Sequence, residues 1–169
     1  MTYQFAELPW GASYEQVERS LAGRGFEFEG RDEVGNLSFS GSLLGNEATV
    51  YALFAHGNLI KVNLLLLPPE HRLFEVYDGM KASLVKKYGP PENSYAFFEE
   101  PFEAGDGYEM TAIFSGKATF SAYWPMTGVS AGTALYIEIT ERLDVSISYE
   151  SPSWSAELER RQAAELDIL

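Results

Sequence analysis

The segment PWGASYEQVERSL, residues 9–21, decides the fold, because it predicts a helix whose pattern returns once more along the chain. Ser13 is a favourable N-cap residue, and Gln16 three positions later completes a capping box. The apolar side chains that follow share one helical face: Tyr14, Val17 and Leu21. A related pattern, YDGMKASL at residues 77–84, lies inside a second helix that we predict over residues 70–88.

Strand patterns follow each of these helices. The clearest pair is a hairpin formed by residues 47–55 and 59–67, and Gly57 with Asn58 predicts its two-residue type II′ turn. A last helix is predicted over residues 153–168. Apolar and polar residues alternate in the other predicted strands, which cover residues 26–29, 37–39, 94–98, 108–115, 117–124, 135–140 and 143–149.

These elements predict an α+β fold, a twisted antiparallel sheet of about seven to eight strands with helices on one face. The chain of 169 residues suits a single domain, residues 1–169, composed of two merged halves, 1–68 and 69–169. The helices match at an offset of 63 residues, which relates Tyr14 to Tyr77, and the last strands match at an offset of 85. A tandem helix-plus-meander repeat is therefore a hypothesis, carried by short amphipathic matches.

The helix opening formed by Trp10, Gly11, Ser13, Glu15 and Val17, followed by a meander, resembles small bacterial domains of the β-lactamase-inhibitor-protein type. Outer-membrane-assembly lipoproteins have a similar start, and the segment YGPP at residues 88–91 matches the helix exit in the second half. The resemblance implies an antiparallel sheet whose exposed face can bind another molecule. It does not imply β-lactamase inhibition or an envelope role, because the inhibitor contacts and the lipobox cysteine are not matched.

Composition excludes several classes of function. The chain has 25 acidic and 12 basic residues, and its formal charge of −13 would repel nucleic acids and anionic membranes. It has no cysteine, which excludes disulfides and thiolate metal sites. The longest apolar run, residues 64–69, is far shorter than the ~20 residues of a membrane span. The N-terminus shows no signal pattern, so we expect a cytoplasmic protein.

No recognisable catalytic motif is present, and we expect neither enzymatic activity nor a cofactor. The two histidines lack ligands at zinc-site spacing and are predicted to be exposed: His56 and His71. The densest acidic stretch lacks the spacing of a calcium loop and includes Glu99, Glu100, Glu103 and Asp106. We predict a solvated loop there that can dock a basic partner. Two carboxylates that converge in space for hydrolysis stay an alternative.

The most suggestive apolar segment is YWPM at residues 123–126, because Tyr, Trp and Met are enriched at the centres of interfaces. Tyr123, Trp124 and Met126 therefore join the acidic stretch as predicted partner-binding residues. Trp124 also fits a core position, because it ends a predicted strand. The leading hypothesis is a non-enzymatic protein-binding module whose partner has a basic surface.

Two alternatives to that hypothesis stay open. A carrier of a small hydrophobic ligand would suit the aromatic content of 14% and a strand that is apolar on both faces around Tyr51 and Leu53. It predicts a cavity of a few hundred Å³. An acidic inhibitor or immunity-type protein for a basic enzyme would suit the net charge, and it predicts an association that weakens with salt.

Overall fold

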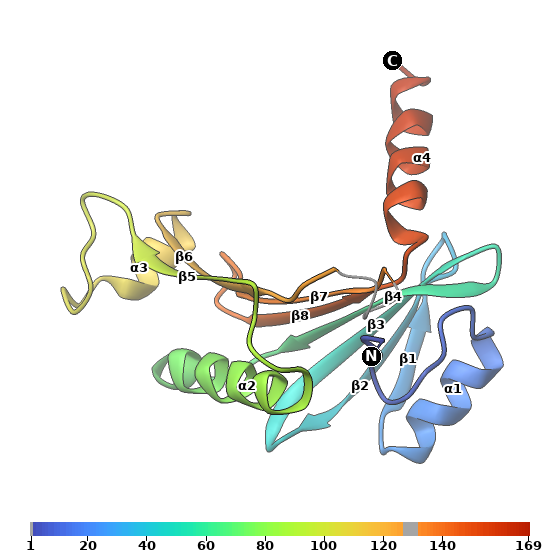
Figure 1. The fold of residues 1–169 in the computed structure, drawn as a ribbon, viewed down its shortest axis with the longest axis horizontal. Helices are drawn as coiled ribbons and strands as arrows, with labels where there is room; N and C mark the ends of the chain where they lie inside the picture. Colours follow the sequence, from blue (N-terminus) through green and yellow to red (C-terminus); the bar gives the residue numbers. More distant parts are fainter. Residues whose placement is uncertain (1, 127–131) are drawn as a thin grey trace.

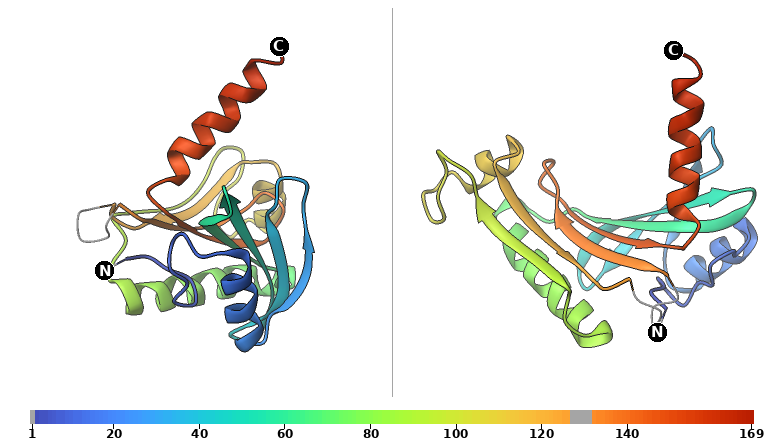
Figure 2. Two further views of the ribbon diagram at one scale, coloured as in Figure 1. Left: turned by 90° about the vertical axis from the view of Figure 1, so that its right-hand side faces the viewer. Right: turned by 45° about the horizontal axis from the view of Figure 1, so that its top comes forward.

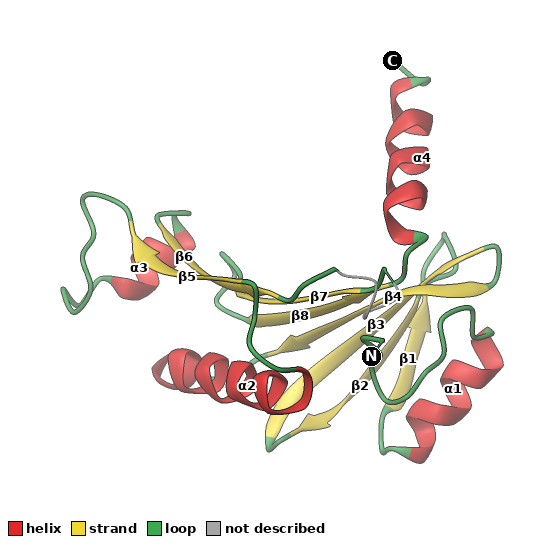
Figure 3. Cartoon of the chain, in the orientation of Figure 1, coloured by secondary structure: helices red, strands yellow, loops and turns green. Residues whose placement is uncertain are grey.

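The computed structural model describes residues 2–126 and 132–169 (Figure 1), and these residues form one antiparallel sheet with four α-helices. The predicted α+β class is confirmed, with eight strands in the described part of the chain. In chain order the elements are α1 (Tyr14–Gly23), β1 (Glu27–Arg31), β2 (Leu37–Leu43), β3 (Asn46–Ala55), β4 (Asn58–Leu66), a 3-10 turn (Glu70–Arg72), α2 (Leu73–Tyr88), β5 (Asn93–Phe98), α3 (Glu109–Phe114), β6 (Ala118–Tyr123), β7 (Ala134–Ile139), β8 (Val145–Glu150) and α4 (Trp154–Leu166). Figure 3 distinguishes the helices from the strands.

The strands lie in the order β1-β2-β3-β4-β8-β7-β6-β5, so two four-stranded meanders join where β4 pairs with β8. Each meander follows a helix, α1 in the first half and α2 in the second. Asn63 of β4 pairs directly with Ser148 of β8, and these two residues are related by the offset of 85 found in the sequence. Each half therefore places a helix before four antiparallel strands, and the second half alone inserts α3 between β5 and β6. The tandem repeat stays a hypothesis.

The main core lies between the sheet and the two helices α1 and α2, which cover the same face of the sheet (Figures 1 and 2). Strand β3 shows the expected alternation, because every second side chain from Ala48 to Phe54 is buried. Val17 and Leu21 of α1 are completely buried. Burying one such side chain contributes roughly 1.5–3 kcal/mol, so this face supplies most of the stability.

The start of α1 is formed by the predicted capping box. The Gln16 backbone N–H donates to the Ser13 Oγ at 3.2 Å, and the Ser13 N–H donates to the Gln16 Oε1 at 2.8 Å. Two backbone donors that the helix itself cannot satisfy are thereby paired. The second helix has no such cap and begins instead after the 3-10 turn at residues 70–72.

Two local predictions are wrong. The segment 108–115 contains the helix α3 instead of a strand, because Ala112 and Ile113 are buried as neighbours on one side of a helical turn. The β3–β4 turn consists of His56 and Gly57, which both have positive φ, as in a type I′ turn. The predicted type II′ turn at residues 57–58 was one residue out of register.

Helix α4 departs from the other helices, since it rises from the face of the sheet opposite α1 and α2 (Figures 1 and 2). The prediction of helices on one face therefore holds for α1 and α2. Helix α2 has 16 residues, and no helix in the described residues combines the length and apolarity needed to cross a bilayer.

Candidate functional site

The face of the sheet opposite α1 and α2, here called the open face, carries a continuous row of polar and aromatic side chains. Cross-strand pairing aligns the row from β3 to β6: Tyr51, Asn63, Ser148, Tyr136 and Tyr123. Asn63 lies at its centre and donates from its amide nitrogen to the Ser148 Oγ at 2.8 Å. The two tyrosines at the end of this row stand on β7 and β6, beside the small side chains of the central strands β4 and β8.

Tyrosine rings dominate the second half of the open face. Tyr123 stacks on Tyr136 with ring centroids 5.6 Å apart and an interplanar angle of 26°. Tyr95 meets Tyr123 edge-on at 6.5 Å. Tyr123 and Tyr95 keep 40% and 44% of their surface exposed. Aromatic side chains that are already ordered by one another lose little conformational entropy on binding, which favours them as interface anchors.

Lys61 fixes the border between this tyrosine cluster and α4. Its Nζ lies 3.0 Å from the Glu150 Oε2 and 4.5 Å from the centre of the Trp154 ring. It also donates to the Tyr136 hydroxyl at 3.4 Å. The ion pair is mostly buried, with side-chain exposures of 14% and 17%. Since Glu150 neutralises Lys61, the pair orders Tyr136 and Trp154 without adding net charge to the face.

Glu138 is the electrostatically unusual group of the open face. Partial burial raises its pKa, repulsion from Asp144 raises it further, and Lys61 opposes these effects only in part. Within residues 2–126 and 132–169, no cationic side chain forms an ion pair with Glu138 at 4.0 Å or less. Asp144 is itself buried and accepts a hydrogen bond from the Thr140 hydroxyl. A cation supplied from outside would therefore find an unneutralised carboxylate here.

Two hollows meet at Tyr123 and Glu138, which line both of them. One has a volume of about 580 Å³ and extends over Ser121, Thr140 and Asp144. The other, of about 620 Å³, extends towards α4; its further lining includes Lys61, Tyr136, Glu150, Trp154 and Leu158. We call the combined surface the tyrosine groove. It offers aromatic planes, a helical wall and side chains of both charges. Glu138, Glu141 and Asp144 are acidic, Arg142 is basic, and none of the four forms an ion pair within the described residues.

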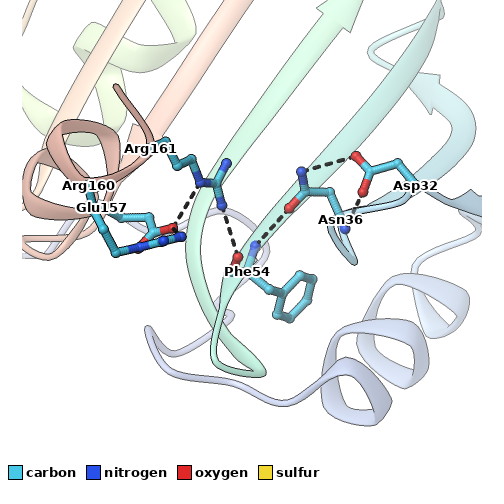
Figure 4. Close-up of polar contacts among 6 residues, drawn as sticks. All are labelled: Asp32, Asn36, Phe54, Glu157, Arg160 and Arg161. Carbon is cyan, nitrogen blue, oxygen red and sulfur yellow. Dashed lines mark hydrogen bonds and ion pairs between the residues drawn. The ribbon is translucent and has the colours of Figure 1, made fainter. Parts of the chain in front are cut away.

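The wall formed by α4 is held by a buried carboxylate at its base (Figure 4). Glu157 accepts hydrogen bonds from Arg160 at 2.9 and 2.6 Å and from Arg161 at 2.9 Å. These bonds lower the pKa of Glu157 to about 2, so the carboxylate stays charged over almost the whole pH range.

The same network ties α4 to the end of β3. The Arg161 Nη2 donates to the Phe54 carbonyl oxygen at 3.2 Å, and the Phe54 N–H donates to the Asn36 Oδ1 at 3.1 Å. Asn36 is held in turn by Asp32, whose carboxylate accepts from its side-chain amide at 3.1 Å (Figure 4). Strand β2 does not extend far enough to pair with Phe54. The side chains of Asn36 and Arg161 therefore bind the N–H and the carbonyl oxygen of Phe54 in its place. The direction of α4, and with it the groove wall, is defined by these contacts.

The predicted apolar segment 123–126 is divided between surface and core. Tyr123 belongs to the tyrosine groove, as described above. Trp124 is only 3% exposed, and its indole N–H donates to the Gly89 carbonyl oxygen at 2.8 Å, so it occupies the core position left open by the sequence. Met126 is exposed but does not line the groove.

The predicted acidic residues are exposed and do not themselves line the tyrosine groove: Glu99, Glu100, Glu103 and Asp106. Their loop follows Phe98, which pairs with Ala118, whereas Tyr123 pairs with Asn93 at the other end of the same hairpin. Asp106 shapes the loop, because its carboxylate accepts from two backbone N–H groups, at 2.9 and 2.7 Å. The acidic loop therefore begins beside the first hollow, which Ala118 lines, but at the opposite end of the hairpin from Tyr123.

Both histidines are exposed, His56 in the β3–β4 turn and His71 in the 3-10 turn. The described part of the chain contains no cluster of three or more His, Asp or Glu side chains suited to a metal ion. The groove residues Tyr136, Glu138 and Lys61 were not predicted as a site. In the sequence these residues occupy polar positions of two predicted strands with alternating patterns. The sequence does not show that these strands lie close together in the sheet.

Comparison of the chain with known protein families, with characterised proteins and with solved structures gave no match. The resemblance to β-lactamase-inhibitor-type and outer-membrane-assembly domains therefore stays a prediction. What the tyrosine groove can do must be argued from its own chemistry.

Proposed function

We propose that this protein is a non-enzymatic binding module whose tyrosine groove docks a protein with a basic surface. The observation that carries the proposal is the position of Glu138, an unpaired and partly buried carboxylate beside the stacked rings of Tyr123 and Tyr136. A protein that inserts a basic side chain would neutralise Glu138 and cover the rings at the same time. An arginine suits both tasks, because its guanidinium stacks on aromatic faces and pairs with carboxylates.

The surroundings of the groove favour a protein partner over a small molecule. The two hollows are shallow and adjoin one another along the sheet, and α4 rises at one side of them. Small-molecule sites are instead concave and largely enclosed. The net charge of −13 would also speed the approach of a basic partner through long-range attraction.

The experiment is affinity capture from the lysate of the source organism at low and high salt, with quantitative mass spectrometry. Immobilised wild type is compared with Glu138→Gln, with Tyr123→Ser and with Tyr51→Ser, a control on the same face in the first half. We expect a partner that is retained at low salt, is reduced at least tenfold by the first two changes and is unaffected by Tyr51→Ser. Retention that ignores all three changes would refute the groove as the docking surface.

An inhibitor or immunity-type protein for a basic enzyme is the narrower form of this proposal. The unpaired Glu138 supports it, since one cation of an enzyme could be covered there. If the captured partner is an enzyme, its activity should fall on addition of wild type and recover in high salt. Turnover of hydrolase substrates by the purified protein, lost in Glu138→Gln, would contradict a non-enzymatic role.

A further inference from the structure

A separate pocket lies on the opposite side of the sheet, between α2 and the segments that flank α1. Its volume is about 450 Å³. Its lining includes core side chains from the sheet, from α2 and from the segment before α1: Phe5, Phe26, Leu64, Met80, Leu84 and Ile147. These six side chains are each at most 9% exposed, so the pocket is an open depression whose floor is the packed core. We call this space the interhelical pocket.

The tip of the β2–β3 hairpin forms an apolar lip of the pocket. Leu44 lines the pocket, is 71% exposed and has a φ of 49°. Gly45 follows with a φ of 80°, so the two residues form a turn that favours Asn and Gly. A leucine there is strained by roughly 1–2 kcal/mol and exposes apolar surface. Leu44 therefore presents an exposed apolar side chain at the edge of the pocket.

The mouth of the pocket is positively charged even though the protein is acidic. Lys87 and Arg24 both line it, together with Glu7. Arg24 meets Glu7 at 3.5 Å, but both side chains are exposed, and such pairs contribute little. Within the described residues Lys87 has no ion-pair partner and lies over the ring of Tyr88 at 5.2 Å. An anionic group at the mouth would therefore be attracted by two cations and repelled by one carboxylate.

We propose that the interhelical pocket binds a fatty carboxylate, with its alkyl chain among the core side chains and its carboxylate at Lys87 and Arg24. The flexible side chain of Met80 suits an alkyl chain of variable conformation. The site is independent of the tyrosine groove, because the two lie on opposite faces of the sheet.

The first test is isothermal titration calorimetry with octanoate, decanoate and dodecanoate, each below its critical micelle concentration. If the chain enters the pocket, each added methylene should tighten binding about twofold to fourfold until the pocket is full. Dodecyltrimethylammonium has the same alkyl chain and the opposite charge, and it should bind at least tenfold more weakly than dodecanoate. Equal binding of the two, or no binding of dodecanoate, would overturn the proposal.

Variants localise the site without touching the core. Ser83 is exposed on α2 and lines the pocket, so Ser83→Trp should fill the mouth and abolish dodecanoate binding. Lys87→Glu should weaken binding at least fivefold, whereas Lys86→Glu, its exposed neighbour outside the pocket, should not.

Leu44→Asn separates ligand binding from folding. Asparagine tolerates positive φ, so this variant should unfold at a higher temperature and yet bind dodecanoate more weakly. Wild-type affinity in both Ser83→Trp and Lys87→Glu would place the fatty acid elsewhere and refute the proposal. Tyr123→Ser, on the other face, should bind dodecanoate as the wild type does.

Discussion

The two halves of the sheet share a topology, but their open faces differ in chemistry. In the first half this face carries mostly small hydroxyl side chains on β2 and β3, among them Ser38, Ser40 and Thr49, with one tyrosine, Tyr51, and one carboxylate, Glu47, on β3. In the second half it carries Tyr95, Tyr123, Tyr136 and Glu138. Meanwhile the opposite face is apolar in both halves and packs on a helix. The two halves therefore share an apolar, helix-covered face and differ in the side chains that their open faces carry.

The largest loss of stability is expected from a substitution on the helix-covered face of the sheet. Ile137 is completely buried on β7, between the open-face residues Tyr136 and Glu138. Ile137→Ala should lower the free energy of unfolding by about 2–5 kcal/mol, because it leaves a cavity in the core. Urea unfolding followed by circular dichroism measures this change. A loss below about 1 kcal/mol would mean that the core of the second half is loosely packed.

A substitution on the open face should instead reduce partner capture strongly and stability only slightly. Tyr123→Ser removes the stacked pair and should reduce partner capture at least tenfold, while the free energy of unfolding falls by only about 0.5–1.5 kcal/mol. Tyr51→Ser, in the same row but in the first half, should leave capture unchanged. If both variants lose capture equally, the docking surface spans both halves, and the comparison drawn above is wrong.

The anchoring of α4 should depend on Glu157. Its pKa falls to about 2 in the folded protein, so its stabilising effect is complete above the unfolded value of 4.5 and is lost as the pH falls towards 2. Glu157→Gln should remove it at every pH, while Glu159→Gln on the same helix should not. Hydrogen exchange measures the effect, and we expect the amides of α4 to exchange faster in Glu157→Gln, with those of α1 unchanged.

The sequence predicts features that depend on neighbouring residues better than features that depend on contacts between distant segments. The capping box of Ser13 and Gln16 involves neighbouring residues, and it was predicted correctly. The segment 108–115 was wrong, because the periodicity of so short a stretch fits a strand as well as a helix. In the structure this helix packs against β6, a contact that the local pattern does not encode.

The candidate site was predicted only in the residue Tyr123. Tyr136 and Glu138 were placed on the polar side of a strand, but nothing local indicated that β7 would lie between β6 and β8. The ion pair of Lys61 with Glu150 requires the β4–β8 pairing, which joins the two halves. Trp124 shows the converse, because an aromatic residue at a strand end suits an interface or a core, and the structure distinguishes them by its 3% exposure and its hydrogen bond to Gly89.

The smallest expected effect concerns Glu138, and it tests whether the second half sacrifices stability for binding. A carboxyl group whose pKa is raised on folding stabilises the protein only while it is protonated, and this stabilisation is lost as the pH rises through the folded pKa. Glu138→Gln should therefore increase the free energy of unfolding at pH 7, by less than about 1 kcal/mol, although it weakens capture. The difference should shrink as the pH is lowered, because the wild-type side chain then becomes protonated.

Glu47→Gln, an exposed change on the open face of the first half, should leave stability nearly unchanged. A Glu138→Gln variant less stable than wild type at pH 7 would show that the carboxylate supports the fold, and the groove would then lose its electrostatic argument for a basic partner.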